Sequence, residues 1–314
     1  MRFIDREEVA RRLTHPAAIR IVREAMLALS RGETRQLLRS ILPLSPGRLY
    51  GSMTGALGAR GPFGSKVLSV FEENVARGRQ SHQGLVLLFD PDSGEPVCAV
   101  HAGELTAIRT AAASAVATDA LARKDARTLA ILGCGEQAAT HLRSIREVRP
   151  LERVTVWGRS PERAAAFATR MEREVGVPVR AVPSAREAVS EADVVCTVTA
   201  AAEPVLLGAW VRPGTHLNLV GSSYLGPVEV DDALVVRSRF FADSREGCLR
   251  QGAEFVKARE AGLIGDEHLV AEIGEVLSGA VAGRRTPEEV TAYKSLGHIV
   301  QDLSTAWALY SGDL

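Results

Sequence analysis

Residues 128–138 read TLAILGCGEQA, an apolar run that ends in the pattern Gly-x-Gly-x-x-Ala. The run predicts a buried strand, and the residues after it predict a helix whose apolar face is Ala138, Leu142 and Ile145. Another apolar run, Val154–Trp157, completes a strand–helix–strand unit. In that context the glycine pattern is typical of a dinucleotide-binding turn.

Each position in the turn suits a pyrophosphate. Gly133 permits a tight turn, Gly135 lets the backbone approach the phosphates, and the small Ala138 lets helix and strand pack closely. Glu136 and Gln137 open the helix, whose N-terminal amides and partial positive charge attract anions. We therefore expect Gly133, Gly135, Glu136 and Gln137 to bind the cofactor. The alternative is a tight turn that binds nothing.

The end of the second strand bears on which dinucleotide is bound. NAD-binding sites usually place an acid there to hold the ribose hydroxyls. This chain has Trp157-Gly158-Arg159-Ser160 instead, with Arg163 close by. A carboxylate would repel a 2′-phosphate, whereas a guanidinium can pair with it. We expect Arg159, Ser160 and Arg163 to favour NADP(H) over NAD(H). The alternative is that Arg159 is a solvated surface arginine and either cofactor is used.

The rest of the chain shows two kinds of sequence pattern. Short β-rich runs between residues 39 and 101 predict an antiparallel sheet, with a turn at Asp90–Gly94 between its last two strands. Gly103–Arg123 is alanine-rich and predicts a long helix. From residue 128 to Phe240–Ala242, strands alternate with helices, which predicts a doubly wound parallel sheet. The fold class is therefore α/β, a Rossmann domain with a smaller α+β domain.

Length and composition narrow the function classes. A chain of 314 residues is long for one core, so two domains are expected. Its formal net charge is zero, so it has no general attraction to nucleic acid. We find no apolar run of the length of a signal peptide or a membrane span. Four scattered cysteines predict reduced thiols in a cytoplasmic protein, and the histidine spacing predicts no metal site.

Several runs together resemble the ornithine cyclodeaminase/mu-crystallin family. In the family's order, they are Gln83-Gly84-Leu85 before Phe89-Asp90, the run LTAIRTAA at 105–112, the glycine turn with Gln137, Ala192–Val195, Pro213–Asn218 with Gly221, and Thr291–Gly297 with Asp302. The resemblance implies a substrate-binding and dimerisation domain of residues 1–113 and 290–314, completed by a helix from about Val290 to Tyr310. Residues 114–289 would form an NAD(P)-binding Rossmann domain. It also implies homodimers formed through the antiparallel sheets, and small α-amino or α-imino acids as substrates.

The resemblance also implies roles for individual residues. Those implied to face the substrate are Arg39, Lys66, Ser81 and Arg109. Those implied to line the cofactor are Thr110, Thr199, Val220, Ser295 and Gly297. A guanidinium such as Arg109 suits a substrate carboxylate, and a buried lysine such as Lys66 can also relay a proton. For each of these cations the alternative is a solvated side chain.

One departure bears on the reaction. Cyclodeaminases resemble one another at a Gly-Gly-Asp-x-Pro-Gly-Lys stretch whose aspartate is a proposed general base, and Ser223 stands at that position here. Relatives of the ketimine reductase type also carry serine there. Because serine is no base at neutral pH, we expect Lys66, Arg109 and Ser223 to serve an NADP-dependent imine reductase, or its reverse, an amino-acid dehydrogenase. The alternatives are a cyclodeaminase with bound NAD and a non-catalytic protein that binds NADPH or a small ligand.

Overall fold

The computed structural model describes residues 1–314, apart from the side chains of Glu72, Val75 and Ala76. It divides into two compact units, one of Met1–Thr110 with His298–Leu314 and one of Ala111–Gly297. Helix α3 (Ala102–Leu121) begins in the first unit and ends in the second. None of the helices in the described residues is both long and apolar enough to span a membrane.

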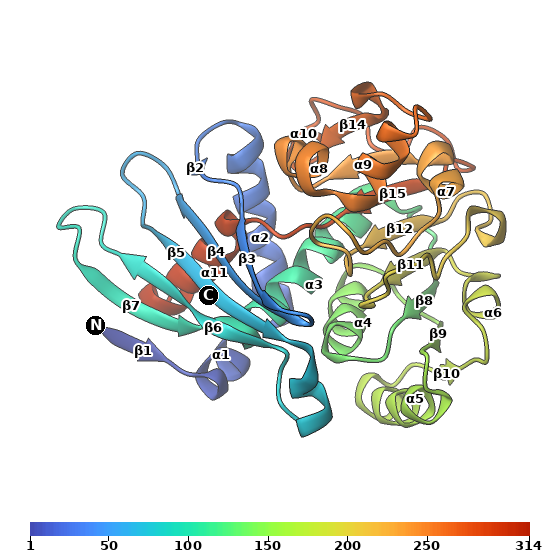
Figure 1. Cartoon of the computed structure of the whole chain (residues 1–314), viewed down its shortest axis with the longest axis horizontal. Coiled ribbons are helices and arrows are strands. Elements are labelled where there is room, and N and C mark those ends of the chain that lie inside the picture. The colour runs from blue at the N-terminus through green and yellow to red at the C-terminus, as the bar shows by residue number, and fades with distance from the viewer. The chain divides into compact units, whose positions relative to one another are not determined.

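The first unit is built on a seven-stranded sheet in the order β1-β7-β6-β5-β4-β2, with β3 paired to β4 (Figure 1). Only β1 and β7 are parallel; the other pairs are antiparallel, as the sequence predicts. The strands are β1 Arg2–Ile4, β2 Arg35–Gln36, β3 Ser40–Ser45, β4 Arg48–Ala56, β5 Phe63–Phe71, β6 His82–Phe89 and β7 Pro96–His101. The helices are α1 Arg6–Arg12, α2 His15–Ser30, η1 Glu72–Arg77 and α11 Ile299–Ser311.

Helix α11 packs against α2 and covers one face of β4, β5 and β6 (Figure 1). The close approach requires small residues in the sheet, because a Cβ at Gly55 would lie 2.8 Å from Ile299 Cγ2. Successive side chains of a strand point to opposite faces of the sheet, so every second residue points toward the helix. Among these, Lys66, Val86 and Leu88 are buried. A lysine on this face is the exception, and it indicates that the space under α11 is not purely apolar.

The second unit is built on an eight-stranded, fully parallel sheet in the order β10-β9-β8-β11-β12-β15-β13-β14. Its strands are β8 Thr128–Leu132, β9 Arg153–Trp157, β10 Val179–Ala181, β11 Val194–Thr197, β12 His216–Leu219, β13 Arg239–Ala242, β14 Leu269–Glu272 and β15 Thr291–Lys294. Its helices are α4 Glu136–Val148, α5 Pro161–Val175, α6 Ala185–Val189, η2 Gly208–Trp210, α7 Asp232–Arg237, α8 Arg245–Gln251, α9 Ala253–Glu260, η3 Asp266–His268 and α10 Ile273–Leu277. The expected doubly wound α/β fold is confirmed.

The expected helix from Val290 to Tyr310 is wrong in its first part. Thr291–Lys294 form β15, which is inserted between β12 and β13 and buried throughout. The strand has a neighbouring strand on each side. In that place its β-branched Thr291 and aromatic Tyr293 favour a strand over a helix. As a result the chain passes between the units at residues 297 and 298, and residues 290–297 belong with the parallel sheet.

Chain order reverses between β8 and β11, since β9 and β10 lie on one side of β8 and the later strands lie beyond β11. In open α/β sheets, ligands bind outside the carboxyl ends of the strands at such a switch point. The polar residues that follow β8, β11 and β12 are therefore the first candidates for a binding site.

Candidate functional site

The glycine turn lies at the switch point. Gly133 has a φ of 126°, which favours glycine, and a Cβ there would lie 2.8 Å from the carbonyl oxygen of Val198 after β11. Gly135 differs, because nothing lies within 4 Å of a Cβ built on it. It is the N-cap of α4, and no side chain caps this helix. The turn thus has the open backbone face and helix start that a pyrophosphate requires.

The two residues that open α4 differ in exposure. Glu136 is exposed, while Gln137 is half-buried and its Oε1 has no partner among the described groups. The sequence predicts contacts with a cofactor for both, and their position beside the open side of Gly135 is compatible with that prediction.

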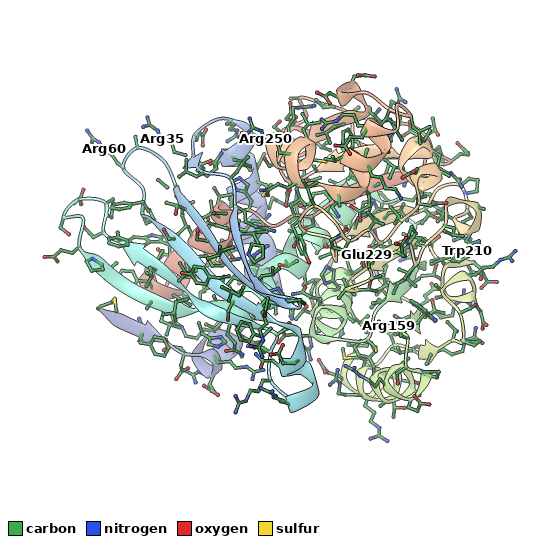
Figure 2. The ribbon with its side chains drawn as sticks, in the orientation of Figure 1. Arg35, Arg60, Arg159, Trp210, Glu229 and Arg250 are labelled. Atoms are coloured by element: carbon green, nitrogen blue, oxygen red, sulfur yellow. The ribbon has the colours of Figure 1, made fainter. Side chains whose placement is uncertain are left out.

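Figure 2 labels Arg159, in the short segment between β9 and α5. Arg159 and Arg163 are exposed, and in the described part of the chain neither forms an ion pair. Ser160 is the N-cap of α5, where its Oγ accepts a hydrogen bond from the Arg163 amide at 3.2 Å. No carboxylate stands at the very end of β9, but Glu162, in the first turn of α5, accepts a hydrogen bond from Ser160 Oγ at 2.8 Å, so one acid lies near the two guanidinium groups.

The carboxyl ends of β11 and β12 are joined by a buried acid that the sequence reasoning missed. Both oxygens of Glu229 accept hydrogen bonds, from Thr197 Oγ1, the Thr199 amide, Thr199 Oγ1 and the Gly221 amide, each at 2.7 Å. Thr199 and Val220, both predicted to line a cofactor, therefore lie at or beside this contact. A glutamate between valines, in Val-Glu-Val, was the only signal in the sequence.

Next to Glu229 lies a second buried cluster at the ends of β12 and β15. Lys294 Nζ lies 2.7 Å from Glu254 Oε2 and donates to Ser222 Oγ at 2.6 Å. The Ser222 hydroxyl also hydrogen-bonds Glu254, whose Oε1 accepts from the Glu229 amide at 3.2 Å. Lys294 and Glu254 are almost completely buried, and Ser223 follows this cluster directly and is half-buried.

The predicted residues after β15 lie at the same edge of the sheet. Ser295 is buried, and its Oγ has no partner among the described groups. The Gly297 amide donates to Asp243 Oδ2 at 2.6 Å, which ties it to the end of β13. Both residues are thus held at the carboxyl edge of the second sheet.

In the first unit, Lys66 and Arg109 converge on one carboxylate. Lys66 Nζ, from β5, lies 2.9 Å from Asp302 Oδ1 and 3.0 Å from Oδ2. Arg109 Nε, from α3, donates to the same Oδ1 at 2.9 Å, and its Nη1 donates to Gln301 Oε1 at 2.9 Å. Lys66, Arg109 and Asp302 are 1%, 3% and 0% exposed, so two cations share one carboxylate in a buried place. The sequence reasoning noted Asp302 but gave it no role, although an acid within an apolar helix was a usable signal.

This cluster carries a surplus of positive charge. Burial, and then the Arg109 guanidinium, lower the pKa of Lys66 from 10.5 to about 7 against the opposing effect of Asp302. Half-buried Arg39 adds to the positive field. Desolvation and these cations also lower the pKa of His82 and of His298 to about 4. His82 is exposed, and the neighbouring cations Lys66, Arg109 and Arg39 disfavour protonation of its imidazole.

Two predicted residues adjoin the cluster without joining it. Ser81 is half-buried, and its Oγ lies 3.0 Å from His82 Nδ1. Thr110 follows Arg109 on α3 and is buried. The structure therefore brings Lys66 and Arg109 together in the first unit, while the predicted glycine turn, Thr199, Val220, Ser295 and Gly297 lie along one edge of the second sheet. No group of three or more metal-ligating side chains occurs among the residues described.

The doubly wound sheet and its glycine turn place the protein in the Rossmann dinucleotide-binding class. Its other unit carries the buried cationic cluster. A sequence model of the ornithine cyclodeaminase/mu-crystallin family matches residues 2–312. The chain is 36% identical over 313 residues to a ketimine reductase mu-crystallin of Mus musculus, covering 98% of this chain and 96% of that protein. The chain belongs to the ornithine cyclodeaminase/mu-crystallin family, as the sequence motifs indicate.

Solved structures, among them the two that follow, also resemble the whole chain. The Δ1-pyrroline-2-carboxylate reductase of Thermococcus litoralis, in complex with NADH and L-proline, has a TM-score of 0.96 at 34% identity and covers 99% of this chain and 97% of its own. The iminosuccinate reductase of Paracoccus denitrificans, in complex with NAD+, has a TM-score of 0.91 at 32% identity and covers 99% and 95%. These two relatives thus carry nicotinamide dinucleotides on the fold described above.

Proposed function

We propose that the protein is a nicotinamide-dinucleotide-dependent reductase of imines derived from small amino acids. The observation that carries this proposal is the buried cluster in which Lys66 and Arg109 share Asp302. Its surplus positive charge suits a substrate that brings a carboxylate, which every α-imino acid has. The names of the relatives support the same chemistry, since ketimines, pyrroline carboxylate and iminosuccinate are all imines or their derivatives.

Reduction of a C=N bond requires a hydride at carbon and a proton at nitrogen. A bound reduced nicotinamide supplies the hydride. In our proposal Arg109 and Arg39 hold the substrate carboxylate, and Lys66 carries the proton, because a pKa of about 7 lets its ammonium give up a proton at neutral pH. Asp302 keeps Lys66 and Arg109 in position through its two oxygens. Ser223 can orient a bound group, but it does not replace a carboxylate base, which makes cyclodeaminase activity the weaker alternative.

The cofactor fits the residues of the second unit. Gly133 and Gly135 leave room for a pyrophosphate at the start of α4, with Glu136 and Gln137 beside it. We further propose a preference for NADP(H) over NAD(H). Arg159, which follows β9, and Arg163, in the first turn of α5, are exposed cations on either side of Ser160 in the chain, and they suit a 2′-phosphate better than bare ribose hydroxyls. Thr110, Thr199, Val220, Ser295 and Gly297 remain proposed lining residues.

A homodimer is also proposed, formed through the first sheet. The face of this sheet opposite Lys66 carries Leu42, Tyr50 and Phe63, which are 59%, 42% and 36% exposed. Phe63 stacks on Phe89 with ring centroids 5.3 Å apart. An exposed apolar face of this kind marks an interaction site. Sedimentation should give a dimer for the wild-type chain and a monomer for Tyr50→Arg.

Reduction is tested with a panel of imines. Purified protein is mixed with Δ1-pyrroline-2-carboxylate, Δ1-piperideine-2-carboxylate, or keto acids with amines, and oxidation of NADPH and of NADH is followed. We expect net cofactor oxidation with at least one cyclic imine. Ammonia release from ornithine or lysine without net cofactor oxidation would instead identify a cyclodeaminase. Tight cofactor binding without turnover of any imine or amino acid would indicate a binding protein.

A further inference from the structure

Glu229 is a completely buried carboxylate that neutral groups satisfy. Its four donors are two threonine hydroxyls and two backbone amides, and all four contacts measure 2.7 Å. An ionised carboxylate only accepts hydrogen bonds, whereas a protonated one also donates, so the charged form of Glu229 matches four donors at once. Burial raises the pKa of Glu229 while the donors and Lys294 oppose that rise. The donor arrangement therefore favours the charged carboxylate, while burial disfavours it.

The four donors belong to two segments at the switch point. Thr197 ends β11, Thr199 lies two residues further, and Gly221 closely follows β12. Gly221 also admits no side chain, because a Cβ there would overlap the Thr199 carbonyl and the Glu229 carboxylate. Glu229 thus fixes the spacing of the two backbone segments through both of its oxygens.

Glu229 is itself held in place. Its amide donates to Glu254 Oε1 at 3.2 Å, and the same oxygen accepts from Ser222. Glu254 is anchored in turn by Lys294 at 2.7 Å. Backbone and side chain of Glu229 are therefore both restrained, in the interior of the second unit (Figure 2).

We propose that Glu229 is a positioning residue for the nicotinamide half of the cofactor, which acts by setting the geometry of Thr199 and Gly221. This inference rests on the proposed dinucleotide function. The glycine turn after β8 and the segment after β9 are proposed for the adenosine diphosphate half, so the nicotinamide half falls to the ends of β11 and β12 across the switch point. A defect at Glu229 should therefore be felt by the nicotinamide end and not by the other half of the molecule.

Asp193 provides a matched control at the opposite, amino edge of the same strands. It is a buried carboxylate just before β11, and its Oδ2 accepts from the Arg127 amide at 2.9 Å, the Thr128 amide at 3.0 Å and Thr128 Oγ1 at 2.8 Å. Asp193 Oδ1 also pairs with Arg123 at 2.8 Å and Arg212 at 2.5 Å, so Asp193→Asn and Glu229→Gln both disturb a buried, multiply bonded carboxylate, with ion pairs at Asp193 alone. Only the second disturbs the carboxyl edge of the sheet.

The experiment measures the dissociation constants of NADPH, of NADH and of ADP-ribose with and without a 2′-phosphate, together with Tm, for wild type and both variants. For Glu229→Gln we expect affinity for the complete dinucleotides to fall on the order of tenfold or more, with ADP-ribose affinity unchanged. Asp193→Asn should lower Tm without such a selective loss. Equal loss for dinucleotide and ADP-ribose, or no loss, would overturn the positioning role.

A milder variant protects the test if Glu229→Gln does not fold. Thr197→Val removes one donor and leaves the carboxylate three, so a smaller loss with the same selectivity is expected. Failure of the proposed dinucleotide binding would look different, because wild-type protein itself would then bind no dinucleotide. If wild type binds and neither variant discriminates between the ligands, only the role of Glu229 is lost.

Discussion

Two buried lysines of this chain differ in how their charge is balanced. Lys66 shares the carboxylate of Asp302 with Arg109, and Arg39 adds further positive charge. Lys294 has Glu254 as its ion-pair partner and Ser222 as a hydrogen-bond acceptor. Both lysines are almost completely buried, at 1% and 0% exposed. The difference lies in the number of cations for each carboxylate.

We propose that this difference separates a binding site from a structural contact. A balanced buried pair is complete without a ligand, whereas a cluster with surplus cations is stabilised when an anion joins it. The lowered pKa of Lys66 agrees with that surplus, because burial and Arg109 both disfavour its ammonium. We therefore assign the substrate carboxylate to the Lys66 cluster and a structural role to the Lys294 cluster.

The largest expected effect is on activity and comes from Lys66→Met. In the proposed reaction the variant loses the proton carrier, so kcat/KM for the imine should fall on the order of 10²- to 10⁴-fold. Arg109 still pairs with Asp302, so the fold should persist, with cofactor affinity near that of wild type. Steady-state kinetics and cofactor titration measure both. A kcat/KM within a few-fold of wild type would remove Lys66 from the chemistry.

The next effect is on stability and comes from Lys294→Met. Glu254 would be left as a buried carboxylate without its cation, which should lower the free energy of unfolding by about 3–5 kcal/mol. The double variant Lys294→Met with Glu254→Leu should regain much of this loss, since the buried pair is then replaced by apolar groups. Urea unfolding of cofactor-free protein gives the free energy of unfolding of the wild type, the single variant and the double variant. The structural assignment predicts recovery in the double variant, so a double variant no more stable than the single one would contradict it.

Sequence patterns predicted a structural element correctly wherever the residues of that one segment determine its structure. The strands expected at Val154–Trp157 and Phe240–Ala242 are found as β9 and β13, each one residue longer, because an apolar run is a local signal. β15 was missed, since only its place between β12 and β13 makes Thr291–Lys294 a strand. The buried acids Glu229, Glu254 and Asp302 were missed as partners for a similar reason. Asp302 contacts Lys66 across 236 positions of the chain, which no local pattern encodes.

A smaller effect concerns protons taken up on binding. The pKa of Lys66 is lowered to about 7 from an unfolded value of 10.5, so between these values the unfolded chain binds the extra proton. This group's contribution to stability should therefore rise with pH across that window, because the lysine is neutral in the folded chain while the unfolded chain still carries the proton. A bound carboxylate should raise the pKa of Lys66 again. Binding of pyrrole-2-carboxylate, a planar mimic, should then take up most of one proton at about pH 8 and little at about pH 6.

Calorimetry in buffers of different ionisation enthalpy gives this proton count directly. Lys66→Met is the control, and it should bind without the pH-dependent uptake. Uptake that persists in Lys66→Met would assign the titration to another group, and equal uptake at both pH values would contradict a lysine pKa of about 7.

The smallest effect extends the comparison to the surface, where Arg159 is a cation without an ion-pair partner among the described residues. Solvent screens an exposed charge, so its contribution should be weaker than that of buried Arg109. Arg159→Ala should shift the ratio of the Michaelis constants for NADPH and NADH toward NADH on the order of tenfold. Arg153→Ala is the control, because Arg153 begins the same strand and already pairs with Glu191 at 2.7 Å. If the ratio of the Michaelis constants is unchanged in Arg159→Ala, Arg159 does not set the cofactor preference. Positive charge without a partner would then indicate an anion site in this chain only where the charge is buried.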